Sequence, residues 1–325
     1  MRGRADDVPG SQMDIAIGIV LVVAGLTVAI VASDVAVSYT RALATGLGAP
    51  PFVVGVVLVA IGTDLPEIAN SIAAQAQGEG DINVGDSVGS TLTQYTFVLA
   101  LFPLVLPVIA ISRRQVGLVT ALTMGGLAVT AVAASDGWLG RRDGLVLVTA
   151  WAISMVLVTR LLPDRTHDEP PIVRLQGHAS RVAVVLVALL AVGLGATVAV
   201  RALIDLAETV GVPTFVLAFF GASIGTSAPE IAVDITALRH GAPAIALGDA
   251  LGSSLIDATL SIGIGPLFFP AAVTASLAVA AALYTLVAVG AVGALISLRR
   301  RHDRTSAVAL LGLYALSYLV LLSVD

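Results

Sequence analysis

Seven acidic residues stand inside segments of the sequence that are otherwise strongly apolar. A carboxylate near the centre of a bilayer costs on the order of 3 kcal/mol or more, so each acid needs a compensating partner. No basic residue lies within the four apolar segments that carry these acids. A bound cation or a proton is the simplest compensation. The seven acids are Asp64, Glu67, Asp86, Glu230, Asp234, Asp249 and Asp257.

The spacing around two of the acids predicts how a cation is held. Thr63 and Glu67 are four residues apart, and so are Thr226 and Glu230. In a helix this spacing places each hydroxyl and carboxylate on one face. A proline precedes each Glu, and because proline has no N–H, a backbone carbonyl four residues earlier loses its helical donor. Carbonyls, hydroxyls and carboxylates are the hard oxygen ligands that Ca²⁺ prefers, and Na⁺ accepts the same set.

A second pair of segments carries polar side chains at the same pitch. Ser90 and Gln94 are four apart, and Ser253 and Asp257 match them. Four glycines in these segments predict close approach between helices. These glycines are Gly85, Gly89, Gly248 and Gly252.

Three of the acids allow two interpretations from sequence. Asp86 and Asp249 lie near expected helix starts, so they either cap backbone amides or line an ion vestibule. Asp234 follows Glu230 by one helical turn, and is expected in a water-filled vestibule or as a direct ligand.

The elements that position these residues are membrane helices. Of the 325 residues, 57% are hydrophobic and 12% are charged, whereas a soluble domain carries about a quarter charged residues. A transmembrane barrel would alternate polar and apolar residues in much shorter segments. The fold class is therefore an all-α integral membrane protein with ten transmembrane helices. The expected spans are 13–33, with a continuation to 45 left open, 52–77, 82–112, 115–135, 144–160, 182–208, 214–238, 242–270, 275–298 and 305–324.

The two halves of the sequence repeat each other at a constant offset of 163 residues. GTDLPE at 62–67 matches GTSAPE at 225–230, and GDSVGS at 85–90 matches GDALGS at 248–253. Five spans per copy put the second copy in the membrane upside down, which is the inverted-repeat architecture of secondary transporters. We assign 1–162 to the first repeat, with its motif at 60–94. Residues 163–181 form a cytoplasmic linker, and 182–325 form the second repeat, with its motif at 223–257.

Arginine placement predicts the orientation. With both termini outside, twelve of the 17 basic residues fall on the inner side, as the positive-inside rule requires. The expected location is the cell membrane, as a multi-pass protein.

The paired motifs resemble the alpha repeats of the sodium/calcium exchanger family, of prokaryotic type, within the cation/calcium antiporter superfamily. The resemblance implies one calcium site flanked by sodium sites, and alternating access in which the first and sixth spans slide past the other eight. It implies central ligands Glu67 and Glu230 with Thr63 and Thr226. Further site positions are Asp64, Ser227, Ser90, Ser253, Gln94, Asp257 and the backbone carbonyls of Ala60 and Ser223.

The sequence departs from the family pattern at several of these positions. Asp64 stands where the family usually has Ser, and Gln94 where Asn or Asp is common. Asp86 and Asp249 stand where Asn is usual. The added carboxylate of Asp64 crowds like charges, so one acid is expected to carry a proton in some states.

The predicted function is a secondary antiporter that exchanges Ca²⁺ for Na⁺. It is not an enzyme, has no cofactor, and has as partners Ca²⁺, Na⁺ and membrane lipid, with no nucleic acid and no obligatory protein partner. The alternative suggested by Asp64 is a Ca²⁺/H⁺ or other divalent-cation/H⁺ antiporter. An intramembrane aspartyl protease is disfavoured, because NVGD at 83–86 and ALGD at 246–249 lack the first glycine of a GxGD element. A passive channel would not need two inverted copies of a closed ligand set.

Overall fold

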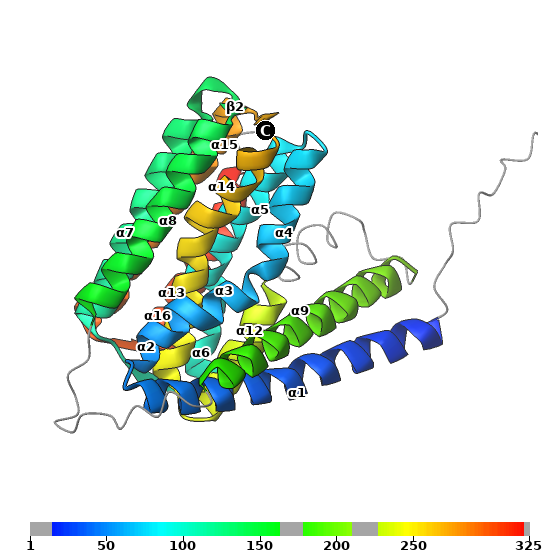
Figure 1. The fold of residues 1–325 in the computed structure, drawn as a ribbon, viewed down its shortest axis with the longest axis vertical. Helices are drawn as coiled ribbons and strands as arrows, with labels where there is room; N and C mark the ends of the chain where they lie inside the picture. Colours follow the sequence, from blue (N-terminus) through cyan, green and yellow to red (C-terminus); the bar gives the residue numbers. More distant parts are fainter. Residues whose placement is uncertain (1–14, 163–177, 210–226, 322–325) are drawn as a thin grey trace, which may run out of the picture.

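The chain forms a bundle of long helices in the computed structural model, which describes residues 15–162, 178–209 and 227–321 (Figure 1). Among these residues, seven helices are long and apolar enough to cross a membrane, or eight if one bent pair is a single span. The unbroken long helices are α1 (Ile15–Leu47), α7 (Arg113–Ala133), α8 (Arg141–Leu161), α9 (His178–Thr209), α15 (Ala275–Arg299) and α16 (Arg304–Leu321). The expected span 214–238 lies mostly outside the described residues, so the count of ten remains a prediction.

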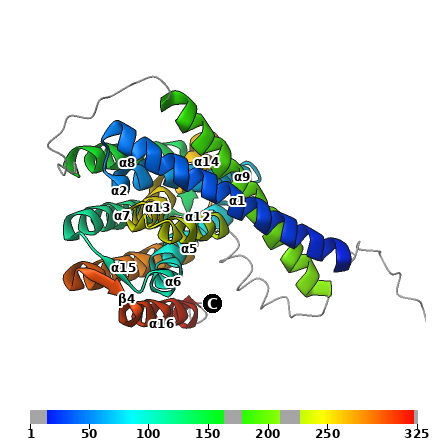
Figure 2. The ribbon, with the colours of Figure 1, turned by 90° about the horizontal axis from the view of Figure 1, so that it is seen from below.

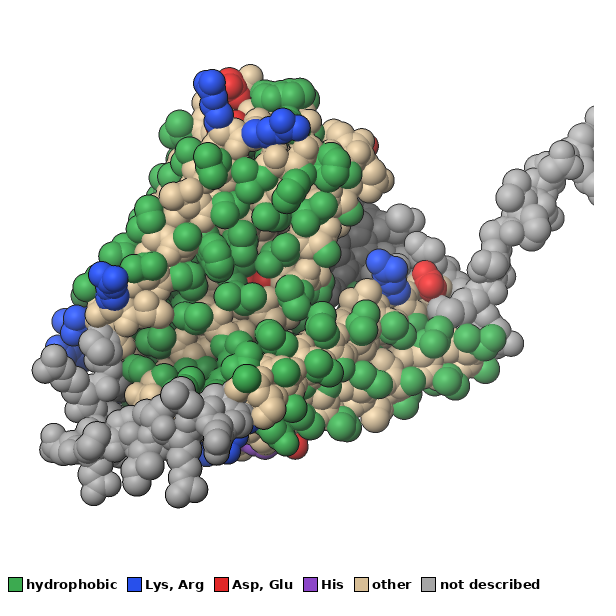
Figure 3. Space-filling model, viewed as in Figure 1, with side chains coloured by type: hydrophobic (Ala, Val, Ile, Leu, Met, Phe, Trp, Pro, Cys, Tyr) green, Lys and Arg blue, Asp and Glu red, His purple; other side chains and the backbone are tan. Residues whose placement is uncertain are grey.

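The surface of the bundle is apolar, as a lipid-facing surface must be. Leu194 on α9, Val287 on α15 and Val132 on α7 expose 70%, 67% and 74% of their surface. Hydrophobic side chains cover most of the face in Figure 3. Soluble proteins rarely expose apolar patches of this extent, so the fold is that of a helical membrane protein.

The predicted span 52–77 is broken in its middle. It consists of α2 (Pro51–Val54), a π-helical segment (Gly55–Val59), α3 (Ala60–Thr63) and α4 (Leu65–Ala76). The two parts on either side of Asp64 are bent by 46°. The bend follows from Pro66, which occupies the first turn of α4 and cannot donate a hydrogen bond to the preceding turn.

The next predicted span of each half is also interrupted, in the same way both times. In the first half, α5 (Gly80–Thr93) continues through a π-helical segment (Gln94–Val98) into α6 (Leu99–Val105). In the second half, α13 (Pro243–Ile256) continues through another (Asp257–Ser261) into α14 (Ile262–Phe268). Every boundary is displaced by the offset of 163 found in the sequence.

These spans end earlier than the sequence predicted. The helix ends at Val105 rather than 112, because Leu106 is extended and precedes Pro107, and a residue before proline avoids the helical conformation. In the second half the helix ends at Phe268, and the next residue, Phe269, precedes Pro270 in the same way.

Proline also leaves one carbonyl without a helical donor in both α6 and α14, and distant side chains replace that donor. Asn83 Nδ2 donates to the carbonyl of Ile262 at 3.1 Å. A ring nitrogen of His302, Nε2, lies 2.7 Å from the carbonyl of Leu99. Both replacements join the first half of the chain to the second.

Four short strands form two small sheets, so the all-α expectation was incomplete. Strand β1 (Val108–Ala110) pairs antiparallel with β4 (Arg301–Asp303), and β2 (Trp138–Leu139) pairs antiparallel with β3 (Ala271–Ala272). Each sheet links a loop of the first half to a loop of the second. Strands this short, between long helices, carry too few residues for a period-two pattern to be seen.

Helices α1 and α9 are repeat equivalents and pack against each other along much of their length (Figures 1 and 2). They run antiparallel, because Gly25 meets Gly195 while the later Ala32 lies beside the earlier Ala188. An antiparallel relation between equivalent helices is what an inverted repeat requires. The 33 residues of α1 span about 50 Å, more than the roughly 30 Å of a bilayer core, so α1 must be inclined to cross it.

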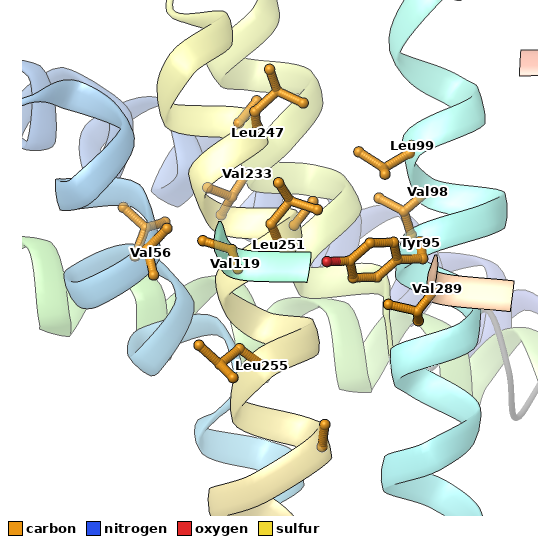
Figure 4. Close-up of a cluster of buried hydrophobic side chains, with 14 of the residues drawn as sticks. Val56, Tyr95, Val98, Leu99, Val119, Val233, Leu247, Leu251, Leu255 and Val289 are labelled. Atoms are coloured by element: carbon orange, nitrogen blue, oxygen red, sulfur yellow. The ribbon is translucent and has the colours of Figure 1, made fainter. Parts of the chain in front are cut away.

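The hydrophobic core surrounds α13. Figure 4 shows Leu247, Leu251 and Leu255 of α13 together with buried side chains such as Tyr95 and Val119 from other helices. Tyr95 is fully buried and donates its hydroxyl to Thr120 at 3.2 Å.

The predicted glycine contacts are confirmed in the second half. In the first half they stay a prediction, because 215–219, the repeat equivalents of 52–56, lie outside the described residues. A Cβ on Gly252 would lie 2.7 Å from the Cα of Val56, and one on Gly248 would collide with the carbonyl of Phe52. A Cβ on Gly85 or Gly89 would meet no described atom within 4 Å.

We predict opposite stability effects for alanine at two equivalent positions. Gly248→Ala should destabilise the protein by about 1–3 kcal/mol, because it overpacks the contact with α2. Gly85→Ala should stabilise it by about 0.5–1 kcal/mol, because alanine favours the helix and nothing is displaced. Thermal unfolding of the purified variants in detergent measures both, and effects of the same sign would contradict the prediction.

Candidate cation-binding site

The starts of α4 and α12 place two glutamates at equivalent positions. Asp64 and Ser227 have nearly the same backbone conformation and immediately precede α4 and α12 (Ala228–Arg239). Glu67 and Glu230 then lie in the first turn of these helices. The N-terminus of a helix favours negative charge, because its free N–H groups and dipole point toward it.

Three carboxylates from the two halves converge near the starts of α4 and α12. One oxygen each of Asp64, Glu67 and Glu230 lies within 4.8 Å of the others. Asp64 and Glu230 are fully buried, and Glu67 exposes 2% of its surface. This geometry can hold a metal ion by carboxylate oxygens alone.

The described part of the protein offers these carboxylates no positive charge. Its ion pairs involve other acids, Asp34 and Asp303. Both oxygens of Asp64, both of Glu230 and Oε2 of Glu67 lack a hydrogen bond within that part of the chain. A buried charge that no protein group compensates needs a bound cation or a proton.

Thr63 connects this cluster to the second half of the chain. Its Oγ1 lies 3.2 Å from Oδ1 of Asp249 and 3.3 Å from Oγ of Ser253. It also lies 3.1 Å from the carbonyl oxygen of Ala60, which accepts from the N–H of Asp64 at 3.0 Å. The predicted site positions Thr63, Ser253 and Ala60 are therefore adjacent.

Gln94 and Asp257 are repeat equivalents that meet each other. Each begins a π-helical segment, and such segments are frequent at functional sites. Nε2 of Gln94 donates to Oδ2 of Asp257 at 3.3 Å, and Ser254 donates to Oε1 of Gln94 at 2.8 Å. Asp257 is also close enough to Asp64 and Glu67 to interact with their charges. The side chain of Gln94 is longer than the Asn or Asp common at this position in the family, and its amide reaches the carboxylate of Asp257.

The remaining predicted residues divide into two groups. Ser90 and Ser227 are buried, with 3% and 0% of their surface exposed, and the hydroxyl of Ser227 has no hydrogen bond to a described residue. Thr226 and Ser223 lie outside the described residues.

Of the two interpretations of Asp249 left open by the sequence, the structure excludes the helix cap, since α13 begins six residues before it at Pro243. Asp86 likewise lies inside α5, where Asn70 donates to its carboxylate at 2.6 Å. Asp234 is fully buried rather than in an open vestibule. The proline at position 243 was the available signal, because proline favours the first turn of a helix.

Comparison with known proteins decides the family. A family model described as sodium/calcium exchanger protein matches residues 17–160 and 180–323. The chain belongs to the sodium/calcium exchanger family. It is therefore a multi-pass membrane protein and a cation/calcium antiporter by family, that is, a transporter and not an enzyme.

Relatives in bacteria and archaea match most of this exchanger-family chain. Inner membrane protein YrbG of Escherichia coli (strain K12) is 30% identical over 266 residues, covering 77% of this chain and 79% of YrbG. Sodium/calcium exchanger MaX1 of Methanosarcina acetivorans is 26% identical over 298 residues, covering 80% and 85%. The solved sodium-calcium exchanger NCX_Mj, soaked with zero Na⁺ and Ca²⁺, has a similar fold, with a TM-score of 0.78 at 21% identity. That match covers 94% of this chain and 99% of the other.

We predict that Asp64→Ser stabilises the ion-free protein at mildly alkaline pH. The change gives the first repeat the serine of the second and removes one of three clustered carboxylates. A loss of about 1 kcal/mol of electrostatic repulsion in the folded state would raise the midpoint of thermal unfolding by roughly 2–4 °C. Ser227→Ala is the control, because it changes the equivalent position without changing charge. An unchanged or lower midpoint for Asp64→Ser would contradict the prediction.

Proposed function

We propose that the protein exchanges intracellular Ca²⁺ for extracellular Na⁺ by alternating access. The observation that carries this proposal is the buried, uncompensated cluster of Asp64, Glu67 and Glu230. Ca²⁺ is a hard cation that favours carboxylates, carbonyls and hydroxyls. The name of MaX1, a sodium/calcium exchanger, supports the same assignment.

The proposed ligands come from both repeats. Glu67 and Glu230 bind Ca²⁺ with Thr63 and Thr226. The flanking positions bind Na⁺, and they include Asp64, Ser227, Ser90, Ser253, Gln94, Asp257 and the carbonyls of Ala60 and Ser223. Because the two kinds of ion share the central carboxylates, the site cannot hold its full set of both at once. Competition for these oxygens couples the two fluxes.

Electrostatics also gives a reason why the ion-free transporter does not change from one orientation to the other. A site with three close, bare carboxylates is strongly disfavoured in a buried environment. Cation binding removes this cost, so the occupied states are the ones that change conformation. Energy released by sodium moving down its gradient then drives calcium export.

The packing of α1 and α9 supports a sliding motion. These helices contact each other far more extensively than they contact α2, α3 or α12. Gly25 and Gly195 allow their backbones to approach closely. In the proposed mechanism the pair moves as one unit past the other helices and exposes the site to each side in turn.

The orientation proposed here puts both termini outside. Pairing of β1 with β4 brings Arg113 close to the end of α15, where its side chain donates to the carbonyls of Ser297 and Leu298. Arg299, Arg300, Arg301 and Arg304 lie in the same region of the chain. A cluster of arginines at one end of the bundle belongs on the cytoplasmic side.

Proton coupling is the second candidate function. Asp64 is fully buried and lies close enough to Glu230 and Glu67 to interact with both charges. Its extra carboxylate could carry a proton in place of a sodium ion.

Proteoliposomes that contain the purified protein distinguish the two coupling ions. We expect radioactive calcium to accumulate when an outward sodium gradient is imposed, and not with an outward proton gradient alone. Accumulation driven only by protons would overturn sodium coupling and assign the chain to the calcium/proton class. Asp64→Ser should retain sodium-driven uptake, and its loss would make Asp64 essential to coupling.

We also predict that Glu67→Gln and Glu230→Gln each reduce calcium transport by more than about 100-fold. Each change removes a direct charged ligand, whereas loss of residues that only support a ligand typically costs 10–100-fold. Glu79→Gln is the matched control, because Glu79 is exposed between α4 and α5. Size-exclusion profiles should remain those of the folded protein. Substantial transport by either site variant would remove that glutamate from the mechanism.

A further inference from the structure

A second pair of acids lies beside the cluster and is not explained by it. Asp234 is on α12, one turn beyond Glu230 toward Arg239, and Asp249 is inside α13. Helices α12 and α13 pack against each other. Both side chains are fully buried, and the two carboxyl groups are close enough to interact electrostatically.

Protein donors do not satisfy this pair within the described part of the chain. Oδ1 of Asp249 lies 3.2 Å from Oγ1 of Thr63. Oδ2 of Asp249 and both oxygens of Asp234 have no hydrogen-bond donor there. None of the ion pairs found in the same residues involves either acid. Three buried carboxylate oxygens are therefore without a hydrogen-bond partner among the described residues.

The repeat provides an internal comparison at the position of Asp234. The equivalent residue is Ser71, whose hydroxyl oxygen accepts from the N–H of Gly265 at 3.2 Å. Ser71 thus has a structural hydrogen bond and no charge. Asp234 adds a charge at the same place and finds no donor.

The comparison at Asp249 gives the same contrast. Its equivalent, Asp86, is less buried and accepts from the amide of Asn70 at 2.6 Å. The residue equivalent to Asn70 is Val233, which has no donor to offer. The second half has therefore lost a donor where it gained a second acid.

We propose that Asp234 and Asp249 bind a sodium ion at a site separate from the Asp64, Glu67 and Glu230 cluster. The pair supplies two carboxylates, and the Thr63 hydroxyl is within reach of the same region. Ca²⁺ takes six to eight oxygen ligands, usually with more acids, so this smaller set favours a monovalent cation. Thr63 directly precedes Asp64 of the cluster and contacts Asp249 of the pair. In this proposal, sodium bound by the pair therefore lies between the cluster and the end of α12.

Equilibrium binding of radioactive sodium to the purified full-length protein tests this site. Asp234→Ser, which installs the residue of the first repeat, should bind one sodium ion fewer per chain than the original protein. Asp234→Asn should show the same loss, and it replaces Asp234→Ser if that variant does not fold. Asp86→Asn is the matched control and should leave the sodium count unchanged.

Calcium binding by the same variants separates this inference from the proposed function. Asp234→Ser should keep calcium affinity within about twofold, whereas Glu67→Gln should lose calcium and retain the sodium ion at the pair. An unchanged sodium count in the Asp234 variants would overturn the new site, and so would an equal loss in Asp86→Asn. Loss of calcium binding by Asp234→Ser to the extent seen in Glu67→Gln would also overturn it, by making Asp234 part of the main cluster.

Discussion

Repulsion among the carboxylates of Asp64, Glu67 and Glu230, all buried and none paired with a basic residue in the part of the chain that the structure describes, constrains the whole molecule. In a low-dielectric interior such charges are stable only when a cation or proton accompanies them. The protein therefore has to hold them close together and keep a path by which ions arrive and leave. The helices that cross the middle of the bundle have to meet both requirements.

Interrupted helices meet these requirements. The break at Asp64 places the start of α4, and hence Glu67, at the cluster, and α12, which begins after Ser227, does the same for Glu230. The π-helical segments present Gln94 and Asp257 at the same level of the bundle. Broken backbone is tolerated in a membrane protein only where other groups satisfy it or where it lines a cavity.

The scaffold is nearly symmetric, whereas its charges are not. Described helices and the π-helical segments that begin at Gln94 and Asp257 recur at the repeat offset of 163 residues. At equivalent positions, however, Asp64 corresponds to Ser227 and Asp234 corresponds to Ser71. If the proposed alternating access holds, a symmetric frame gives its two orientations similar energies, and the unequal side chains are what distinguishes the two halves of the ion pathway.

The sequence by itself determined the membrane class and the internal repeat, and it singled out Glu67 and Glu230, which the structure brings together with Asp64. Hydropathy, a constant offset and an acid in an apolar segment are local signals that need no knowledge of neighbours. Only the tertiary structure brought Thr63 to Asp249, 186 residues away. Only it showed that Gly248 packs closely against Phe52 and Gly55. These outcomes depend on how each helix is rotated and on which distant helix it meets, and a pattern along one chain does not record either.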